Sequence, residues 1–428
     1  MATMQKRKGH AGVSNDRHTT SCNDHQTSFS KQPTSPATEE DRDDWKGFCE
    51  IESDPAFFDV MLRNFGVKGV KVLEVFGLDD ELLSMLPCQH IFRQPVYGLI
   101  FLFKWIEDDP ERQEPSCPEG VWFANQTVGN ACASVALLNI VNNVPGIELG
   151  GPLEQFKAFT KDFTPALRGD QIGNFEFLKR IHNSFARKMD MLNCDLALKN
   201  ETHSKKTKVG RTKYDYTSDG IDVSYHFIAF VPIDGNLWKL DGLERQPQNL
   251  GRCDSKDWLS LAKPHIESRI MGYEGEQIEF SLLGLARDPM CNLRVSLAEN
   301  VKDLQGLQQQ MDKLEPGWRE ERFQNLKTEG LLLGPDIAYG LTQDNIDSAE
   351  LSEEIKGLLL EGDMSSLEET WSSLARGQTH LRANIVEEEQ STRRDDDRAA
   401  NRRHDYGPFV QKWIQVLARK GVLRELLE

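Results

Sequence analysis

Apolar residues recur along this chain at two spacings, and each spacing predicts one kind of element. In "ESDPAFFDVMLRNFG" (52–66), apolar positions at helical spacing follow Ser53, Asp54 and a proline and end at a glycine, which predicts a helix. The stretches "GVKGVKVLEVFG" and "VYGLIFLFKW" predict strands, the second one buried on both faces. We expect order to begin near Trp45.

Two further apolar helices are expected downstream. The first follows the Gly/Asn turn in "FANQTVGNACASVALLNIVNN" (123–143), with Cys132 at the junction. The second ends the stretch 162–187 and is capped by Asn174. His182 lies beside its apolar stripe and is interpreted as a core or surface histidine rather than a catalytic one. That stripe consists of Phe175, Leu178, Ile181 and Phe185.

The stretch "YHFIAFVPIDGNLWKLDGL" (225–243) predicts two strands around a turn, because Asp-Gly is a hairpin signal. A third strand is expected in "QIEFSLLGLARDP". Two polar segments lack periodicity. Residues 1–44 contain almost no aliphatic side chains and predict a disordered arm, in which "KRK" at 6–8 is more simply a solvated tail than a nuclear-import patch. Residues 193–220 predict a long loop, either a functional lid or a disordered insert.

The last third of the chain has a different pattern. From 293 to 314, apolar residues at steps of three and four predict an amphipathic helix that can pair as a coiled coil. Helical pattern returns over 350–390, followed by a charged linker or solvated helix at 387–404. A short helix is expected after Pro408, with one face formed by Phe409, Trp413, Ile414 and Leu417.

Composition narrows the classes of function. The chain has 428 residues and a formal net charge of −17, which argues against a general nucleic-acid surface and suits a partner with a basic face. It contains no apolar run long enough for a membrane span, and its first residues do not resemble a secretory signal. The scattered cysteines indicate neither a disulfide framework nor a zinc site, so a reducing compartment, cytoplasm or nucleus, is expected.

Cys132 is the first candidate for chemistry. A cysteine attacks as the thiolate, which the positive end of a helix and a neighbouring imidazolium both stabilise. The predicted helix start meets the first condition. A lone cysteine in an apolar helix is nevertheless more often inert packing.

The predicted hairpin places a histidine, His226, in a defined position relative to an aspartate, Asp241. If Asp234 and Gly235 form the turn, facing residues have numbers that sum to 469 (233 + 236). Asp241 then lies on the same face as His226, one diagonal step away, within reach of a hydrogen bond that fixes the ring. The alternative is a polar pair at the end of a sheet, and a slip of one residue would separate the two. Gln126, six residues before Cys132, can offer an amide to a developing oxyanion.

Together these residues resemble the ubiquitin carboxyl-terminal hydrolases, a family of thiol proteases. The matching motifs are Gln126 with "NACAS", the His and Asp of 225–243, and "LRGDQIGNFEFLKRIHNSFAR" between them. The resemblance covers about 45–290 and implies an α+β, papain-like fold: a central antiparallel sheet flanked by helices. It also implies that Cys132 is the nucleophile, His226 the general base, Asp241 its orienting partner and Gln126 the oxyanion donor, with no cofactor and no metal.

The resemblance extends to the tail. Residues 291–392 and 393–428 are similar to the helical extension and the partner-binding tail of the family's long-tailed branch, whose members bind the proteasome or chromatin complexes. Residues 193–220 correspond to a segment that crosses the cleft, and its length predicts a mobile loop that admits large conjugates. We therefore expect a deubiquitinase acting on ubiquitin and its conjugates, not on nucleic acid or membranes. The alternatives are a catalytically silent ubiquitin-binding scaffold and, with less support, another papain-like acyl transferase.

Overall fold

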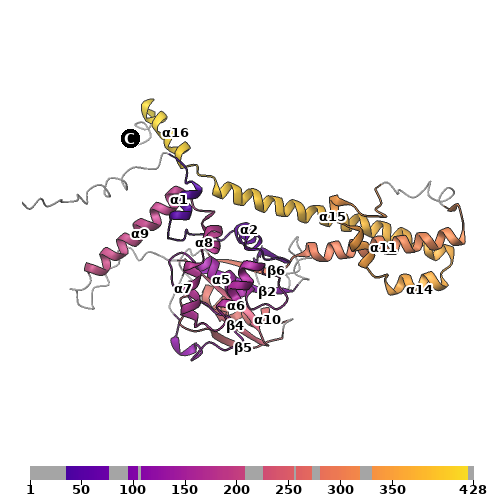
Figure 1. Ribbon diagram of the computed structural model, residues 1–428, viewed down its shortest axis with the longest axis horizontal. Helices are drawn as coiled ribbons and strands as arrows, with labels where there is room; N and C mark the ends of the chain where they lie inside the picture. The colour runs from indigo at the N-terminus through magenta and orange to yellow at the C-terminus, as the bar shows by residue number, and fades with distance from the viewer. Residues whose placement is uncertain are drawn as a thin grey trace, which may run out of the picture. The chain divides into compact units, whose positions relative to one another are not determined.

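The computed structural model describes residues 35–76, 95–104, 108–207, 225–254, 257–271, 280–318 and 330–422, except for the side chains of 200–207. Residues 37–405 form one compact unit, and the chain from residue 406 onward belongs to a second unit. Within the first unit we distinguish a sheet domain, residues 37–288, from a helical extension, residues 289–405 (Figure 1).

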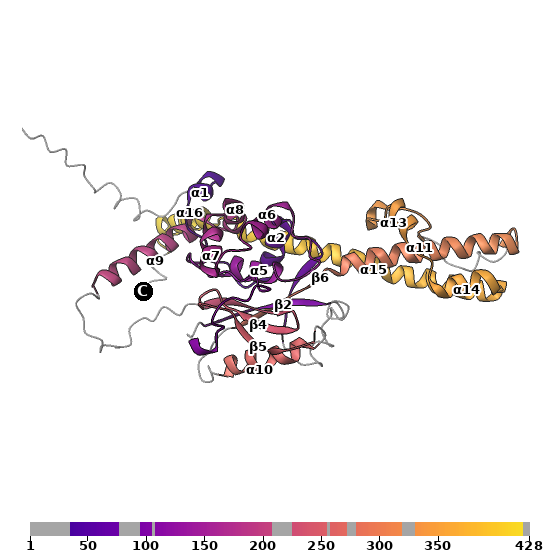
Figure 2. The ribbon, with the colours of Figure 1, turned by 60° about the horizontal axis from the view of Figure 1, so that its bottom comes forward.

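An antiparallel sheet lies at the centre of the sheet domain (Figure 2). Its strand order is β1-β6-β2-β3-β4-β5. Each neighbouring pair of strands is antiparallel. All strands expected from the sequence are confirmed; β5 was not expected. The strands are β1 (Val70–Glu74), β2 (Val96–Lys104), β3 (Tyr225–Ile233), β4 (Asn236–Leu240), β5 (Gln248–Arg252) and β6 (Ser281–Arg287).

The β3–β4 hairpin has the predicted register. Asp234 and Gly235 both have positive φ, 48° and 74°, as a tight two-residue hairpin turn of the right twist requires. Ile233 pairs with Asn236, and the pairing continues to Ala229 opposite Leu240, so facing numbers sum to 469 throughout.

Helices cover both faces of the sheet, and strand residues alternate between two hydrophobic clusters. In β3, Phe227 and Ala229 belong to the larger cluster, beneath helices α2, α5 and α8, whereas Ile228 packs on the opposite face with Trp258 of α10. The alternation follows from the two-residue repeat of a strand. Strand β2 contributes to both clusters, which confirms that it is buried on both faces.

The helices confirm most of the expected positions. The first predicted helix is α2, capped by Asp54 and closed by Gly66 in the left-handed conformation. The α-helices of the described residues are α1 (Glu39–Asp44), α2 (Pro55–Phe65), α5 (Cys132–Val141), α6 (Gly151–Phe159), α7 (Pro165–Asn174), α8 (Glu176–Asn183), α9 (Lys188–Thr207), α10 (Trp258–Met271), α11 (Pro289–Leu314), α13 (Gln343–Ser348), α14 (Glu353–Glu361), α15 (Met364–Arg403) and α16 (Gly407–Arg419).

The helical extension is built on two long antiparallel helices, α11 and α15. Asn300 of α11 donates to the carbonyl of Leu374 and accepts from the buried Gln378, both on α15. Leu297 packs with Ile385 in one cluster, and Met311 packs with Trp371 in another. The amphipathic helix expected from 293 to 314 is thus confirmed, and α15 is its partner.

Helix α15 also contacts the sheet domain directly. Lys71 of β1, whose side chain is buried, forms an ion pair with Glu388 and donates to Ser391 Oγ at 3.2 Å. Arg63 of α2 forms an ion pair with Asp396 at 2.8 Å. The charged stretch 387–404 is therefore a helix with contacts, rather than a linker.

Several boundaries differ from the sequence-based expectation. Order begins before Trp45, because residues 39–44 form α1, held by a Thr38 capping box and an ion pair between Asp41 and Lys188. Asn174 does not cap α8; it ends α7, and the N-cap of α8 is Phe175. The expected division at 392/393 falls inside α15, which is continuous there.

The predicted loop over 193–220 is wrong in its first part. Residues 193–207 belong to α9, and residues 208–220, on which the expected cleft-crossing loop depends, lie outside the described residues. Among the α9 side chains that are described, Met191 is buried in the core, whereas Leu196 and Leu198 are exposed, so apolar periodicity did not reveal the helix. Of the disordered arm expected over 1–44, residues 1–34 likewise lie outside the described residues.

The tail helix α16 confirms the expected helix after Pro408, which occupies its first turn. It buries none of its residues, and Phe409 and Trp413 are 68% and 56% exposed. Within the described part of the chain, no helix is both long and apolar enough to cross a membrane. The antiparallel sheet, its two helical layers and the helical extension confirm the expected α+β, papain-like class.

Candidate active site

The helix that carries the candidate thiol begins at Cys132 itself. Its N-cap residue, Ala131, has no side-chain oxygen for the first-turn N–H groups. Asn130 takes the left-handed conformation, with φ of 59°, and turns the chain into the helix. Free N–H groups at a helix start carry partial positive charge and favour an anion there. The expected position of Cys132 in the first turn is confirmed.

Cys132 is also the accessible end of an otherwise buried element. Every residue from 133 to 141 is buried, whereas Cys132 is half-buried. The helix packs on the central sheet, where Ala133, Ala136 and Leu137 share a cluster with Phe227 and Ala229 of β3. Packing against the sheet therefore fixes α5 beside the strand that carries His226.

His226 and Asp241 meet at the end of the β3–β4 hairpin, as the register predicts. Nε2 of His226 lies 2.7 Å from Oδ1 of Asp241, and both side chains are almost fully buried. The same Oδ1 accepts the backbone N–H of Leu243 at 2.9 Å, which holds the carboxylate in place.

The charges of this pair support each other despite their burial. Burial alone would lower the pKa of His226, but hydrogen bonds with Asp241 and with the Cys132 thiol raise it to about 9. Burial would raise the pKa of Asp241, but its hydrogen bond to His226 and the nearby Lys239 ammonium keep that pKa below its ordinary value. The imidazolium and carboxylate forms are both favoured at neutral pH.

Gln126 lies on the loop that leads to Cys132, next to the hairpin. Its backbone N–H donates to the carbonyl of Gly242 at 2.8 Å. A Cβ on Gly242 would lie 3.1 Å from that nitrogen, so the close approach favours glycine after Asp241. The side-chain Oε1 of Gln126 is buried and has no hydrogen-bond partner among the described residues. The backbone hydrogen bond thus holds Gln126 beside the hairpin, while its side-chain Oε1 accepts no hydrogen bond from the hairpin.

Two residues that sequence reasoning missed support this loop. Asn125 Nδ2 donates to the carbonyl of Glu244 at 2.6 Å, a second tie between loop and hairpin. Gly169 of α7 faces the Asn125 carbonyl, and a Cβ there would lie 2.1 Å from that oxygen. The adjacent "NQ" and the glycine in "LRGD" were visible in the sequence, but their contacts depend on tertiary packing.

The hydrogen bonds of His182 are with other groups. It is fully buried and hydrogen-bonded to Ser134 and to the Cys49 carbonyl, in agreement with its interpretation as a core histidine. Among the described residues, no group of three or more His, Cys, Asp or Glu side chains is arranged to hold a metal ion.

Comparison with known proteins places the chain in a family. Residues 48–271 match the family model described as ubiquitin carboxyl-terminal hydrolase, family 1. The chain is 30% identical to ubiquitin carboxyl-terminal hydrolase isozyme L5 of Dictyostelium discoideum, over 90% of this chain and 95% of that protein. It is 32% identical to ubiquitin carboxyl-terminal hydrolase 2 of Schizosaccharomyces pombe, over 69% and 91%.

A relative with a longer chain and a solved structure are also similar. Ubiquitin carboxyl-terminal hydrolase calypso of Drosophila virilis is 29% identical, over 89% of this chain and 76% of that protein. The crystal structure of the Trichinella spiralis UCH37 catalytic domain bound to ubiquitin vinyl methyl ester is 31% identical, with a TM-score of 0.43, over 56% of this chain and 96% of that one. By the family model and the matches along nearly the whole chain, this protein belongs to family 1 of the ubiquitin carboxyl-terminal hydrolases and is a thiol-dependent deubiquitinase.

Proposed function

We propose that Cys132 is the nucleophile of this hydrolase, that His226 is its general base and acid, and that Asp241 orients His226. The observation that carries this proposal is the 2.7 Å contact between His226 Nε2 and Asp241 Oδ1. Because that contact occupies Nε2, the other ring nitrogen, Nδ1, is left for the Cys132 thiol. The pKa of His226, which is raised to about 9, further supports a protonated ring beside the Cys132 sulfur.

The reaction follows from these positions. The Cys132 sulfur attacks the carbonyl carbon of ubiquitin's C-terminal glycine, and the bond to the leaving amine breaks after His226 donates its proton to that nitrogen. The acyl-enzyme is then hydrolysed by a water molecule whose proton passes to His226. Asp241 keeps the ring orientation through both steps and stabilises the imidazolium.

Gln126 is proposed to donate its side-chain amide to the oxygen that becomes negative in each tetrahedral intermediate. Its support is the hydrogen bond between its backbone N–H and the Gly242 carbonyl, which keeps Gln126 beside the His226–Asp241 pair. The N–H groups at the start of α5 provide the second part of such a site. Preorganised donors of this kind stabilise the transition state more than the substrate.

The tail is proposed to bind a protein partner, a proteasome subunit or a regulator of a chromatin complex. The support is the apolar face of α16, on which Phe409, Trp413 and Ile414 are all exposed. An amphipathic helix with such a face suits a hydrophobic groove. We propose the cytoplasm, the nucleus or both as the location of the protein, because its cysteines are scattered and those described are free.

Hydrolysis of a fluorogenic ubiquitin derivative tests the catalytic assignment. The wild type, Cys132→Ala, His226→Ala and the control Cys253→Ala are compared at equal folded concentration. We expect the first two variants to be inactive and the control, a half-buried cysteine after β5, to match the wild type. Full activity in Cys132→Ala would contradict the assignment. An inactive wild type that still binds ubiquitin would favour the silent-scaffold alternative.

A further inference from the structure

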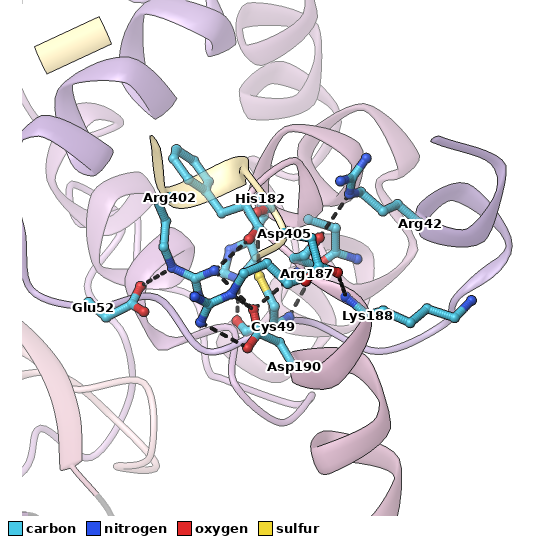
Figure 3. Close-up of polar contacts among 12 residues, drawn as sticks. Arg42, Cys49, Glu52, His182, Arg187, Lys188, Asp190, Arg402 and Asp405 are labelled. Carbon is cyan, nitrogen blue, oxygen red and sulfur yellow. Dashed lines mark hydrogen bonds and ion pairs between the residues drawn. The ribbon is translucent and has the colours of Figure 1, made fainter. Parts of the chain in front are cut away.

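A fully buried histidine, His182, joins the nucleophile helix to an adjacent segment. Its Nδ1 lies 2.8 Å from Ser134 Oγ. Its Nε2 lies 2.8 Å from the carbonyl oxygen of Cys49, and Figure 3 shows His182 next to Cys49. Since a carbonyl only accepts, Nε2 donates, and Nδ1 therefore accepts from the Ser134 hydroxyl. Burial lowers the pKa of His182 to about 4, so this neutral tautomer persists at neutral pH.

The next residue, Asn183, also forms hydrogen bonds with the backbone of residues 47–49. Asn183 Oδ1 accepts the Cys49 N–H at 3.1 Å, and its Nδ2 donates to the Gly47 carbonyl at 2.9 Å. The Phe48 ring packs edge-on against the His182 ring, with centroids 5.1 Å apart. The end of α8 thus fixes the backbone of 47–49 through three directional contacts.

Residues 47–49 in turn hold Asn130. Asn130 Nδ2 donates to the carbonyl of Phe48 at 3.3 Å and lies 3.3 Å from Cys194 Sγ on α9. Asn130 is the left-handed residue that sets the start of α5. Cys132 is therefore bracketed: the residue two positions before it is held through Phe48, and the residue two positions after it, Ser134, is held by His182.

We propose that His182 is a positioning residue for Cys132: it holds Ser134 directly and Asn130 through residues 47–49, so that the sulfur keeps its place against His226. The inference rests on the proposed role of Cys132 as nucleophile. A displacement of the order of 1 Å between reacting groups is enough to slow an enzyme about 10²-fold. These two contacts, one at Asn130 before Cys132 and one at Ser134 after it, restrict both translation and rotation of the helix start.

Helix α15 of the helical extension adds further contacts to the same region. Arg402 has a side chain that is only 8% exposed and donates through Nε to Glu52 at 2.7 Å (Figure 3). Its Nη1 donates to Asp190 and to the Phe185 carbonyl, each at 2.9 Å. Phe185 follows the end of α8 by two residues, so Arg402 anchors the chain directly after His182 and Asn183.

Asp405, two residues beyond the end of α15, and Asp190 stabilise the start of α9. Asp405 Oδ2 accepts the backbone N–H of Lys188 at 3.2 Å, as an acidic cap at a helix start does. Asp190, the partner of Arg402, accepts the N–H of Arg187 at 3.0 Å. The segment 184–190 is thus fixed from the tail side, while Cys194 of the same α9 contacts Asn130. The contacts form a continuous path from Arg402 to the start of α5.

The proposal is tested by removing, one at a time, the two contacts that bracket Cys132: Ser134 with His182, and Asn130 with Phe48. We call these two contacts the bracket. Ser134→Ala removes the hydroxyl that donates to His182, and Asn130→Gly removes the amide but keeps a backbone that tolerates positive φ. Thr160→Val is the matched control, because Thr160 is a buried hydroxyl that bonds to Trp122 Nε1 away from the bracket. In the full chain we measure kcat and KM on the fluorogenic ubiquitin substrate, the rate of Cys132 alkylation by iodoacetamide, and the unfolding midpoint.

The expected result separates positioning from stability. Ser134→Ala and Asn130→Gly lower kcat by about 3- to 10-fold, as mutations along a coupling path do, with KM changed less than about twofold. Both also slow alkylation of Cys132. Thr160→Val lowers the unfolding midpoint but leaves kcat unchanged. If the two bracket variants keep the wild-type kcat and alkylation rate, the positioning role of His182 is overturned.

Arg402→Gln tests the extension to the tail, with Arg398→Gln as its control. Arg398 lies one turn earlier on α15 and is largely exposed, and its ion pair, 3.3 Å long, is with Asp54 at the start of α2 rather than with segment 184–190. We expect Arg402→Gln to lower kcat as Ser134→Ala does, with Arg402→Lys restoring part of it. The double variant Arg402→Gln/Ser134→Ala should show less than the sum of the single effects. Equal behaviour of Arg402→Gln and Arg398→Gln overturns the extension.

The failure of this inference is distinct from failure of the catalytic assignment. If Cys132→Ala is inactive while the bracket variants match the wild type, only the inference falls. If Cys132→Ala retains activity, the assignment of the nucleophile fails, and the inference falls with it.

Discussion

Nε2 of His226 lies 2.7 Å from Oδ1 of Asp241, although 15 residues separate them in the chain. A two-residue turn makes this contact possible, because its register places both side chains on one face of the hairpin. Both groups are buried, so water competes little for the hydrogen bond.

Loss of the carboxylate should impair orientation rather than abolish chemistry. Asp241→Asn keeps the shape of the side chain and removes its charge. We expect kcat to fall by about 10- to 100-fold, less than the loss from removing a well-placed general base, which reaches about 10⁴-fold. Steady-state kinetics on the fluorogenic substrate measures this. Unchanged kcat would remove Asp241 from the site.

The alkaline limit of activity should reflect His226. Because the pKa of His226 is raised to about 9, the imidazolium that we propose as the proton donor to the leaving amine persists until the pH rises through that value. We expect kcat to fall above about pH 9 and the fall to move to lower pH in Asp241→Asn, since the raising contact is lost. A pH–rate profile from 6 to 10.5 checks both, and identical alkaline limbs in the two proteins would contradict the account.

The titration of His226 also affects the free energy of unfolding, which should fall as the pH rises. The folded pKa of His226, about 9, lies above its ordinary value of 6.5, so the folded state binds the proton more tightly. The stability that this provides is complete below about pH 6.5 and is lost as the pH rises through about 9. Denaturant unfolding of the wild type and of Asp241→Asn should show a difference that shrinks over that range. A difference that grows with pH would be inconsistent with a raised folded pKa.

Gln126 should matter to the transition state and not to substrate binding. Gln126→Ala removes the proposed oxyanion donor but leaves the backbone bond to Gly242 intact. We expect kcat to fall by about 10²–10³-fold with little change in KM, as for other side-chain oxyanion donors. Thr127→Ala, an exposed neighbour on the same loop, serves as the control. A rise in KM at constant kcat would indicate a binding role instead.

The contact between α15 and the sheet should contribute to stability. Lys71 is buried and forms an ion pair with Glu388. Glu388→Ala leaves that ammonium without its carboxylate, and we expect the free energy of unfolding to fall by up to about 3 kcal/mol, the low end for breaking a buried pair. Glu389→Ala, whose partner Arg393 is exposed, should change it by less than about 1 kcal/mol. Equal effects would show that the Lys71 pair is not special.

Local patterns predicted the parts of the structure that depend on neighbouring residues. The Asp234-Gly235 turn fixed the hairpin register, and with it the contact of His226 and Asp241. The Gly/Asn turn before Cys132 predicted the helix start. The pairing of amphipathic α11 was foreseen, but its partner α15 was not.

The missed features all depend on contacts between distant residues. Helix α1 consists of polar residues held by Lys188, and the sequence of α9 lacks a regular apolar spacing, so hydrophobic periodicity predicts neither helix. The bond between Ser134 and His182 joins residues 48 apart. Nothing near either residue in the sequence indicates this bond, and only the packing of α8 against α5 reveals it.

Covalent labelling with ubiquitin vinyl methyl ester tests the central claim most directly. The full chain, Cys132→Ala and His226→Ala are incubated with the probe, and the modified peptide is identified by mass spectrometry. The account predicts one ubiquitin adduct on Cys132 in the wild type, none in Cys132→Ala, and much slower labelling in His226→Ala. An adduct on another cysteine, or equal labelling rates in the wild type and His226→Ala, would contradict it.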